Sequence, residues 1–235
     1  MAGLGEAVEL IGTDPNPFLA TVGLRIEPAP IGSGVRFDLD VELGSMPLAF
    51  MRAVEVTVRE TLRQGLCGWD VPDCAVAMTH SGYWAKQSHS HATFDKSMSS
   101  TARDFRQVTP IVVLEALRAG GTEVHEPMHR FVLEAPGDAL GPLLPALAQL
   151  GAIPDAPTTR GAACVIEGEI PAAQVHALRQ QLPALTRGEG LLESEFDRYQ
   201  PVRGATPHRT RRGHDPLDRE AYVLRVLRPS AGVGS

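Results

Sequence analysis

The stretch from Cys74 to Arg130, CAVAMTHSGYWAKQSHSHATFDKSMSSTARDFRQVTPIVVLEALRAGGTEVHEPMHR, decides how the first half of the chain is organised. It begins as an alternating apolar strand, passes through a long polar loop and continues as a helix with one apolar face. The loop opens with two adjacent aromatic residues, Tyr83 and Trp84. Two large rings side by side on a loop cannot both be buried, so we expect at least one to contact something outside the protein's own core.

Basic and titratable side chains follow the aromatic pair, namely Lys86, His89, His91 and Lys96. Aromatic rings stack on nucleic-acid bases and cationic groups neutralise phosphates, so this order of residue types is typical of a loop that binds nucleic acid. The alternative is that one ring packs onto the base of its own loop. The residues alone leave both interpretations open.

A metal site is a competing interpretation of the same loop, with His80, His89, His91 and Asp95 as ligands. Alternate positions on a loop lack the i, i+4 register of a helical metal motif, and no partner can be named for the outer imidazole nitrogens. We therefore expect no metal site and no catalytic residue. The alternative from another class is a hydrolase that uses these side chains, and stoichiometric zinc in the purified protein would favour it.

Two further groups of reactive residues have structural explanations. Cys67 and Cys74 lack a CxxC spacing and are expected to be buried thiols. With Cys164 they are too few for a disulfide framework, which favours a reducing compartment. Glu167 and Glu169 alternate near a strand end, and we expect solvated or capping groups there rather than a catalytic pair.

Charge is distributed unevenly along the 235 residues, whose net charge is −6. The net charge is −6 over residues 1–78, +1 over 79–130, −6 over 131–197 and +5 over 198–235. We expect the basic tail to be an extended arm that contacts RNA phosphates, because the planar guanidinium group suits such contacts. The candidate residues for these phosphate contacts are Arg203, Arg209, Arg211 and Arg212. The alternative is a tail that is merely solvated.

The first half of the chain alternates strands and helices. Apolar spacing predicts strands at Leu19 to Glu27, Val35 to Leu43 and Cys74 to Thr79, and a helix from Pro47 to Gln64. A second helix begins at a capping box, Thr101 to Asp104, and ends at Gly120. Pro110 either kinks this helix or marks its true start.

The second half has a different rhythm: strand, helix, strand, strand, helix, strand. The helices are expected at Pro136 to Leu150 and Ile170 to Leu182, and the last strand at Gly190 to Tyr199. This order is typical of a ferredoxin-like fold in which two helices cover one antiparallel sheet. The fold class is therefore α+β. A final helix begins with Asp215 as N-cap and Pro216 at its first position, and its Leu217, Tyr222, Val223 and Val226 are expected to dock on the first half.

Several ordered motifs then resemble one family. NPFLATVGLRIEPAPIGSG, LCGWDVPDC, DFRQVTPIVVLEAL, AGGTEVHEP and VIEGEIPAAQVHALRQQLPALTRGEG are similar to the C-terminal half of ribosomal protection-type tetracycline resistance proteins, which are relatives of elongation factor G. The resemblance extends from about Asp14 to Arg228. It implies that residues 1–12 end a third domain, 13–129 form an elongated fourth domain with a left-handed crossover, 130–203 form the fifth, and 204–235 form a basic arm and C-terminal helix.

The resemblance also implies a ribosomal partner, namely small-subunit rRNA near the decoding site. Three loops are expected to converge at the tip of the fourth domain: Pro28 to Gly34, Gly44 to Pro47 with Ser45 and Met46, and Ser81 to Ser99. Tyr83 and Trp84 fall where the family has a tyrosine pair. Ala85 and Lys86 replace the serine and proline that follow that pair in the family, so Lys86 is expected to contact a phosphate.

No segment fits the phosphate-binding loop G-x-x-x-x-G-K-[ST], since the only lysines, Lys86 and Lys96, do not follow glycine. We expect this chain to lack GTPase activity and cofactors, with GTP and Mg²⁺ belonging to an N-terminal domain. No membrane segment or secretory signal is evident, so a cytoplasmic monomer is expected. An elongation factor G-type translocase is the alternative to a resistance factor.

Overall fold

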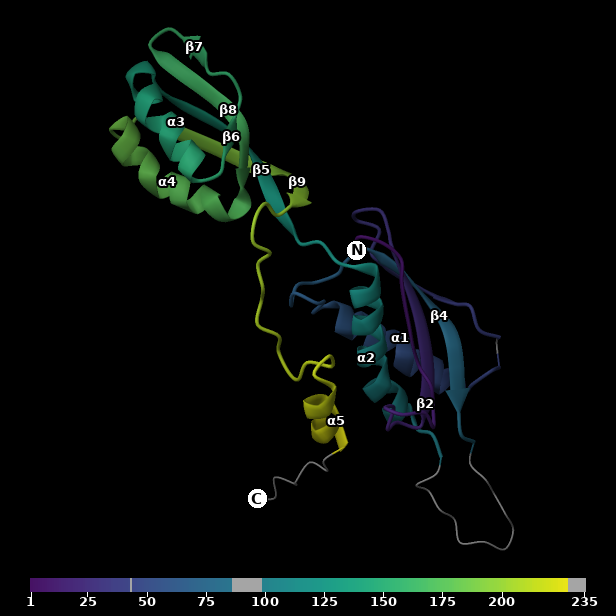
Figure 1. Cartoon of the computed structure of the whole chain (residues 1–235). Helices are drawn as coiled ribbons and strands as arrows, with labels where there is room; N and C mark the ends of the chain where they lie inside the picture. Colours follow the sequence, from purple (N-terminus) through teal and green to yellow (C-terminus); the bar gives the residue numbers. More distant parts are fainter. Residues whose placement is uncertain (43, 86–98, 228–235) are drawn as a thin grey trace, which may run out of the picture. The chain divides into compact units, whose positions relative to one another are not determined.

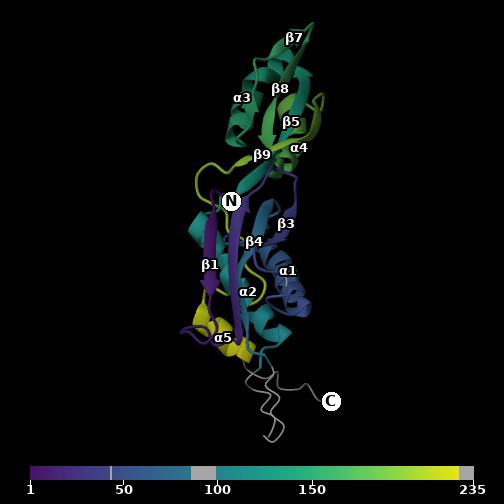
Figure 2. The ribbon, with the colours of Figure 1, turned by 90° about the vertical axis from the view of Figure 1, so that its right-hand side faces the viewer.

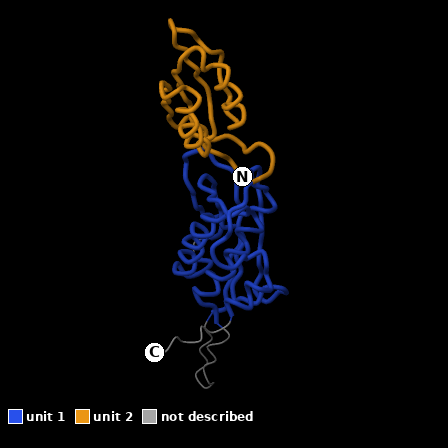
Figure 3. Tube along the Cα trace, turned by 90° about the vertical axis from the view of Figure 1, so that its left-hand side faces the viewer, with its two compact units in different colours: residues 1–123, 207–235 blue, residues 124–206 orange. Residues whose placement is uncertain are grey.

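The computed structural model describes residues 1–42, 44–85 and 99–227, which form two compact units (Figure 3). Unit 1 comprises Met1–Glu123 and the C-terminal segment from Pro207, and unit 2 comprises Val124–Thr206. Along the sequence, unit 2 is thus inserted between the body of unit 1 and its last segment. Each unit has its own hydrophobic core.

The sheet of unit 1 contains four strands in the order β1-β2-β4-β3. β2 pairs antiparallel with β1 and β4, whereas β3 runs parallel to β4. Alternate residues of β2 and β4 are fully buried because they face the helices. The strands are β1 (Gly5–Glu9), β2 (Ala20–Pro28), β3 (Val35–Leu39) and β4 (Cys74–Tyr83).

Two helices, α1 (Leu48–Leu62) and α2 (Ala102–Gly120), lie on the same face of this sheet (Figures 1 and 2). The predicted capping box is confirmed, since the Asp104 carboxylate accepts hydrogen bonds from the backbone N–H of Thr101 at 2.8 Å and from its hydroxyl at 2.6 Å. Pro110 lies inside α2, which continues through it, so it does not mark the start of the helix.

Two predicted strands have different lengths in the structure. The alternation that predicted a strand to Leu43 gives only β3, which ends at Leu39. β4 is longer than predicted and continues to Tyr83, because its polar second half pairs with the beginning of β2.

The expectation that residues 1–12 end a preceding domain is wrong. Gly5–Glu9 is an edge strand of unit 1 that pairs with β2, with Gly5 opposite Ile26 and Glu9 opposite Val22. Gly5 lies so close to α2 that a Cβ there would come within 1.9 Å of the Ala116 carbonyl oxygen. Only glycine permits this approach of strand and helix.

Unit 2 has the βαββαβ order that the sequence predicted. Its sheet order is β6-β8-β5-β9, all antiparallel, with β7 continuing the edge formed by β6. Figure 1 shows α3 and α4 together on one face. The unit begins at Val124 and ends at Thr206, rather than at the predicted 130 and 203. Its elements are β5 (His125–Pro136), the 3-10 turn η2 (Gly137–Ala139), α3 (Leu140–Gln149), β6 (Ile153–Pro154), β7 (Thr158–Arg160), β8 (Ala163–Pro171), α4 (Ala172–Thr186) and β9 (Leu191–Pro201).

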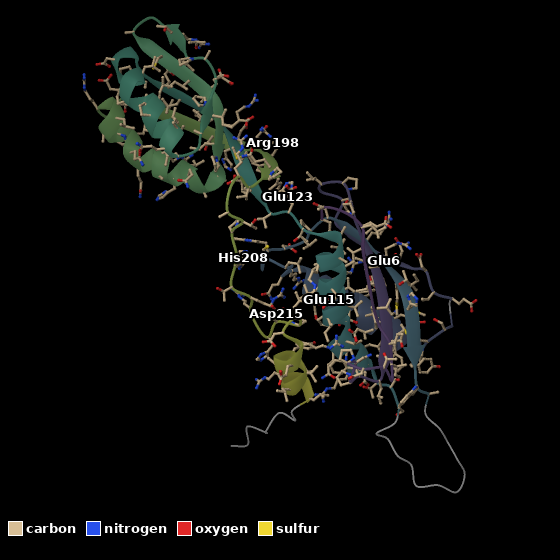
Figure 4. All side chains as sticks on the ribbon, viewed as in Figure 1. Glu6, Glu115, Glu123, Arg198, His208 and Asp215 are labelled. Carbon is tan, nitrogen blue, oxygen red and sulfur yellow. The ribbon has the colours of Figure 1, made fainter. Side chains whose placement is uncertain are left out.

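The last described segment, Pro207 to Leu227, returns to unit 1 and ends in α5 (Arg219–Leu227). We call it the extension. As predicted, Tyr222 is buried against the core of unit 1, and Leu217, Val223 and Val226 pack beside it. The N-cap prediction is wrong, because Asp215 (Figure 4) forms a turn and the Asp218 carboxylate accepts the Ala221 N–H at 3.3 Å. Among the described residues no helix is both long and apolar enough to cross a membrane.

Candidate nucleic-acid interface

The aromatic pair lies where β4 ends. Tyr83, the last residue of β4, is opposite Ala20, the first residue of β2. Just before it, the Ser81 hydroxyl lies 2.9 Å from the Ser45 hydroxyl, so the loop that precedes α1 meets β4 at this end. We call this end of unit 1 the tip, and it consists of residues 10–19, 44–48, 81–85 and 99–101.

The loop Pro28 to Gly34 does not belong to the tip. Antiparallel pairing places Pro28, the last residue of β2, opposite Cys74, the first residue of β4. The Gly34 N–H also donates to the Asp73 carboxylate at that end, at 2.9 Å. Strands rise about 3.3 Å per residue, so this loop and Tyr83 are separated by roughly 30 Å. The expectation that all three loops converge is therefore wrong, and only two of them do.

Tyr83 belongs to the edge of the core. Its ring meets the ring of Phe50 edge-on, with centroids 5.8 Å apart, and Phe50 stacks on Phe105 at 4.7 Å. Offset and edge-to-face pairs of this kind stabilise a core beyond the area they bury. Tyr83 is therefore a packed ring, but its partner lies on α1 and not at the base of its own loop.

Trp84 is the exposed member of the pair, with 39% of its surface accessible. Its backbone is held by Ser100, which is buried and 7% exposed. The Trp84 N–H donates to the Ser100 hydroxyl at 2.7 Å, the Ser100 N–H donates to the Trp84 carbonyl at 3.0 Å, and the same hydroxyl donates to the Leu19 carbonyl at 2.5 Å. The tip thus presents an exposed indole on a fixed backbone.

Other predicted tip residues have different positions. Ser45 is exposed, whereas Met46 is 3% exposed and packs in the core, so its side chain does not reach the surface. Lys86 and Lys96 lie outside the described residues, and so do His89, His91 and Asp95 of the metal interpretation. Within the described part of the chain, no three His, Cys, Asp or Glu side chains are grouped to hold a metal ion. His80 is described, and its Nδ1 lies 3.0 Å from the Thr79 hydroxyl.

The remaining thiol and carboxyl predictions fall away from the tip. Cys74 is buried, which raises the pKa of its thiol to about 11, whereas Cys67 is half-buried. In unit 2, Glu169 accepts two hydrogen bonds from the guanidinium of Arg198 (Figure 4), at 2.5 and 2.6 Å. These bonds lower the pKa of the Glu169 carboxyl. Glu169 is thus held in an ion pair and is not the solvated or capping group that the sequence predicted.

Three of the four arginines predicted to form an extended arm follow the surface of unit 1. Arg209 lies over the ring of Trp69 at 5.8 Å, and its N–H donates to the Cys67 carbonyl at 2.9 Å. Arg211 donates to the Gly65 carbonyl at 2.8 Å, and the Arg212 N–H donates to Gln64 at 2.6 Å. Arg203 belongs to unit 2. The extension is therefore attached along its length, and the guanidinium groups of Arg209 and Arg212 remain on the surface.

One anchor of the extension was missed by the sequence analysis. Arg219 donates two hydrogen bonds to the carboxylate of Glu9 on β1, both at 2.6 Å, and the two side chains are 26% and 13% exposed. These bonds raise the pKa of Arg219. The two residues lie 210 positions apart along the chain. The contact could have been predicted only if residues 1–12 had been expected to pair with β2.

Comparisons with known proteins agree with this division. Residues 6–121 match the family model of elongation factor G, domain IV, and residues 123–210 match that of the elongation factor G C-terminus. Neither model is a GTPase domain.

The chain is similar to curated tetracycline resistance proteins. It is 43% identical over 231 residues to an oxytetracycline resistance protein of Streptomyces rimosus, covering 96% of this chain and 33% of the relative. It is 40% identical over 203 residues to the tetracycline resistance protein TetM of Streptomyces lividans, covering 86% and 30%. It is 34% identical over 226 residues to TetP of Clostridium perfringens, covering 96% and 33%. The chain thus spans about a third of the length of these relatives.

A crystal structure of a protein from Thermus thermophilus shares the fold. The TM-score is 0.58 at 21% sequence identity, and the match covers 97% of this chain and 30% of that one.

Proposed function

Because this chain belongs to the elongation factor G family, with a domain IV followed by the family's C-terminal domain, we propose that it is the ribosome-binding part of a factor that releases tetracycline from the small subunit. The relatives that are named as tetracycline resistance proteins support this choice within the family. The observation that carries the proposal is the exposed Trp84 on its fixed backbone at the tip.

The tip suits contact with unpaired bases near the decoding site. Stacking a base on an aromatic ring contributes about 1–3 kcal/mol to binding. Less conformational entropy is lost on binding when the backbone that carries the ring is already fixed. The hydrogen bonds of Ser100 fix the backbone of Trp84, and Tyr83 packs the end of β4 against the core. Trp84 is then the group that competes with the drug for its rRNA site, and the Ser45 hydroxyl lies on the rim of the same surface.

The extension supplies the electrostatic part of the proposed binding. Arg209 and Arg212 face solvent and are the candidates for phosphate contacts, with Arg211 fixed beneath them. In this proposal GTP and Mg²⁺ are bound by other domains of a longer factor, which acts in the cytoplasm as a monomer. The second candidate, a translocase, is supported by the two elongation factor G models that match the chain.

A chimaera tests the proposal. The matching third of the Streptomyces rimosus relative is replaced by this chain, and release of labelled tetracycline from purified 70S ribosomes is measured with GTP. We expect release by the chimaera and its loss on Trp84→Ala, with ribosome-stimulated GTPase activity retained. A chimaera that drives translocation but releases no drug would instead establish the translocase function.

A further inference from the structure

A groove of about 290 Å³ lies between α1, α2 and the extension in unit 1. Thr61 and Gln64 line it from α1, Arg106 and Pro110 from α2, and Arg211 and His214 from the extension. Gln64 fixes the extension to α1, because it accepts from the Arg212 N–H at 2.6 Å and donates to the Arg212 carbonyl at 3.3 Å. The walls of the groove are thus held in place.

Cationic side chains dominate the groove. Arg211 is only 16% exposed and is fixed by its bond to the Gly65 carbonyl and by a longer ion pair with the exposed Asp215, at 3.8 Å, so its guanidinium group is preorganised. Arg106 is exposed, and its side chain makes no hydrogen bond or ion pair to any described residue. His214 lies on the extension side, and Glu60 is the acidic residue of the lining. The balance favours an anionic ligand, and the open shape favours a chain that passes through over an enclosed small molecule.

A backbone acceptor adds a second recognition element. In an α-helix the carbonyl of residue i accepts from the N–H of residue i+4. Residue 110 is proline, which has no N–H, so the carbonyl of Arg106 lacks that donor. Both residues line the groove. A carbonyl without its helical partner, beside cationic groups, suits a ligand that offers a hydroxyl donor next to an anion. Ribose with its phosphate has both, and DNA lacks the hydroxyl.

We infer that this groove binds an RNA backbone segment, with a phosphate at Arg106, His214 and Arg211 and a ribose 2′-hydroxyl at the Arg106 carbonyl. This inference rests on the proposed ribosomal function and adds to it a contact away from the tip. It assigns the extension a role as a wall of an RNA-binding groove. Arg106, which the sequence analysis did not name as a binding residue, becomes a direct ligand.

The test measures the affinity of the 235-residue chain for purified 30S ribosomal subunits at several salt concentrations. We expect Arg106→Glu to weaken binding about tenfold or more, which is the equivalent of one charge-assisted contact. The slope of the logarithm of the binding constant against the logarithm of the salt concentration should become less steep by about one. Arg118→Glu is the matched control, because it makes the same charge change on the same helix outside the groove. It should weaken binding less than about threefold, as expected for a distant exposed charge.

Pro110→Ala separates the hydroxyl contact from general charge. The new N–H gives the Arg106 carbonyl its helical donor, so the melting temperature should rise while affinity for 30S subunits falls several-fold. A purely structural role for Pro110 would not move the two quantities in opposite directions, and unchanged affinity would remove the hydroxyl contact from the proposal.

The outcomes distinguish the groove from the tip. Equal losses for Arg106→Glu and Arg118→Glu would overturn the groove as a site. Binding that depends on Trp84 but not on Arg106 would retain the proposed function and overturn only this inference. A chain that binds no 30S subunits would overturn both.

Discussion

Unit 1 and unit 2 each pack two helices on one face of a sheet around a separate core, and each exposes aromatic rings to solvent. In unit 2 the rings are Phe196 and Tyr199 on β9, which are 52% and 49% exposed and lie 5.2 Å apart. Glu195 and Asp197 flank Phe196 along the strand, Asp197 is paired with Arg198, and unit 2 carries a net charge of −4 over residues 124–206. In unit 1 the exposed rings are Trp69, which lies beneath Arg209 of the basic extension, and Trp84 at the tip, which are 40% and 39% exposed.

If the proposed function is correct, an exposed aromatic ring does not by itself indicate RNA binding. A base stacks on any aromatic face, but its phosphate must be accepted nearby, and carboxylates repel it. We therefore expect RNA binding at the tip of unit 1 and not around Phe196 in unit 2. The experiments that follow test this contrast, beginning with the largest expected effect.

The separateness of the two cores gives the largest expected effect. Phe131 and Phe105 are fully buried in units 2 and 1, respectively. Each substitution by alanine should lower the free energy of unfolding of its own unit by about 3–5 kcal/mol, because it removes apolar contacts and leaves a cavity. Hydrogen exchange resolved by peptide measures each unit separately. If Phe131→Ala accelerated exchange equally in both units, the description of two independent cores would be wrong.

The anchor between the extension and β1 gives the next effect. Arg219→Ala leaves the partly buried Glu9 carboxylate without its partner, and we expect a loss of about 2–3 kcal/mol in the stability of unit 1. Unit 2 should be unaffected. Urea unfolding measures the loss, and Arg225→Ala on the exposed side of α5 is the control. Replacing both members of the pair should cost less than the sum of the single changes, because they share one interaction.

The aromatic contrast itself is tested by three alanine variants. Trp84→Ala should weaken binding of the chain to 30S subunits by roughly 5-fold to 150-fold, the loss of one stacked base, with little change in stability. Tyr83→Ala should instead lower stability by about 1–3 kcal/mol through its lost contact with Phe50. Phe196→Ala in unit 2 should leave affinity unchanged. Equal losses for Trp84→Ala and Phe196→Ala would contradict the role assigned to local charge.

The sequence was sufficient for the parts of the fold that depend on local patterns. Apolar periodicity located α1, α2 and the βαββαβ order of unit 2, and the capping box at Thr101 appears as predicted. Prediction from local patterns failed where the residues that pair lie far apart along the chain. β1 is a short segment with two glutamates, and nothing local predicts its pairing with β2 or the contact between Glu9 and Arg219.

The candidate site was predictable in residue type and not in arrangement. The aromatic pair could be found from two adjacent rings on a polar loop. Which ring is exposed depends on Phe50, far earlier in the chain, and on the clamp that Ser100 forms with Leu19. The loop Pro28 to Gly34 does not join the other two loops, because the direction of β2 places it at the opposite end of the sheet. Amino-acid composition does not reveal strand direction.

The smallest expected effect concerns the acidic side of the comparison. Hydrogen bonds from Arg198 lower the pKa of Glu169 in the folded state below that of the unfolded chain, which is about 4.3. A depressed carboxyl pKa contributes stability that is present above the unfolded pKa and is lost as pH falls through the folded pKa. Unit 2 should therefore lose a small part of its stability below about pH 4.3, and Glu169→Gln should remove that part of the pH dependence. Because 47% of the Arg198 side chain is exposed to solvent, added salt should reduce the effect as well. Melting temperatures of the two proteins between about pH 3 and 6 measure it, and parallel curves would show that the ion pair contributes nothing to the folding of unit 2.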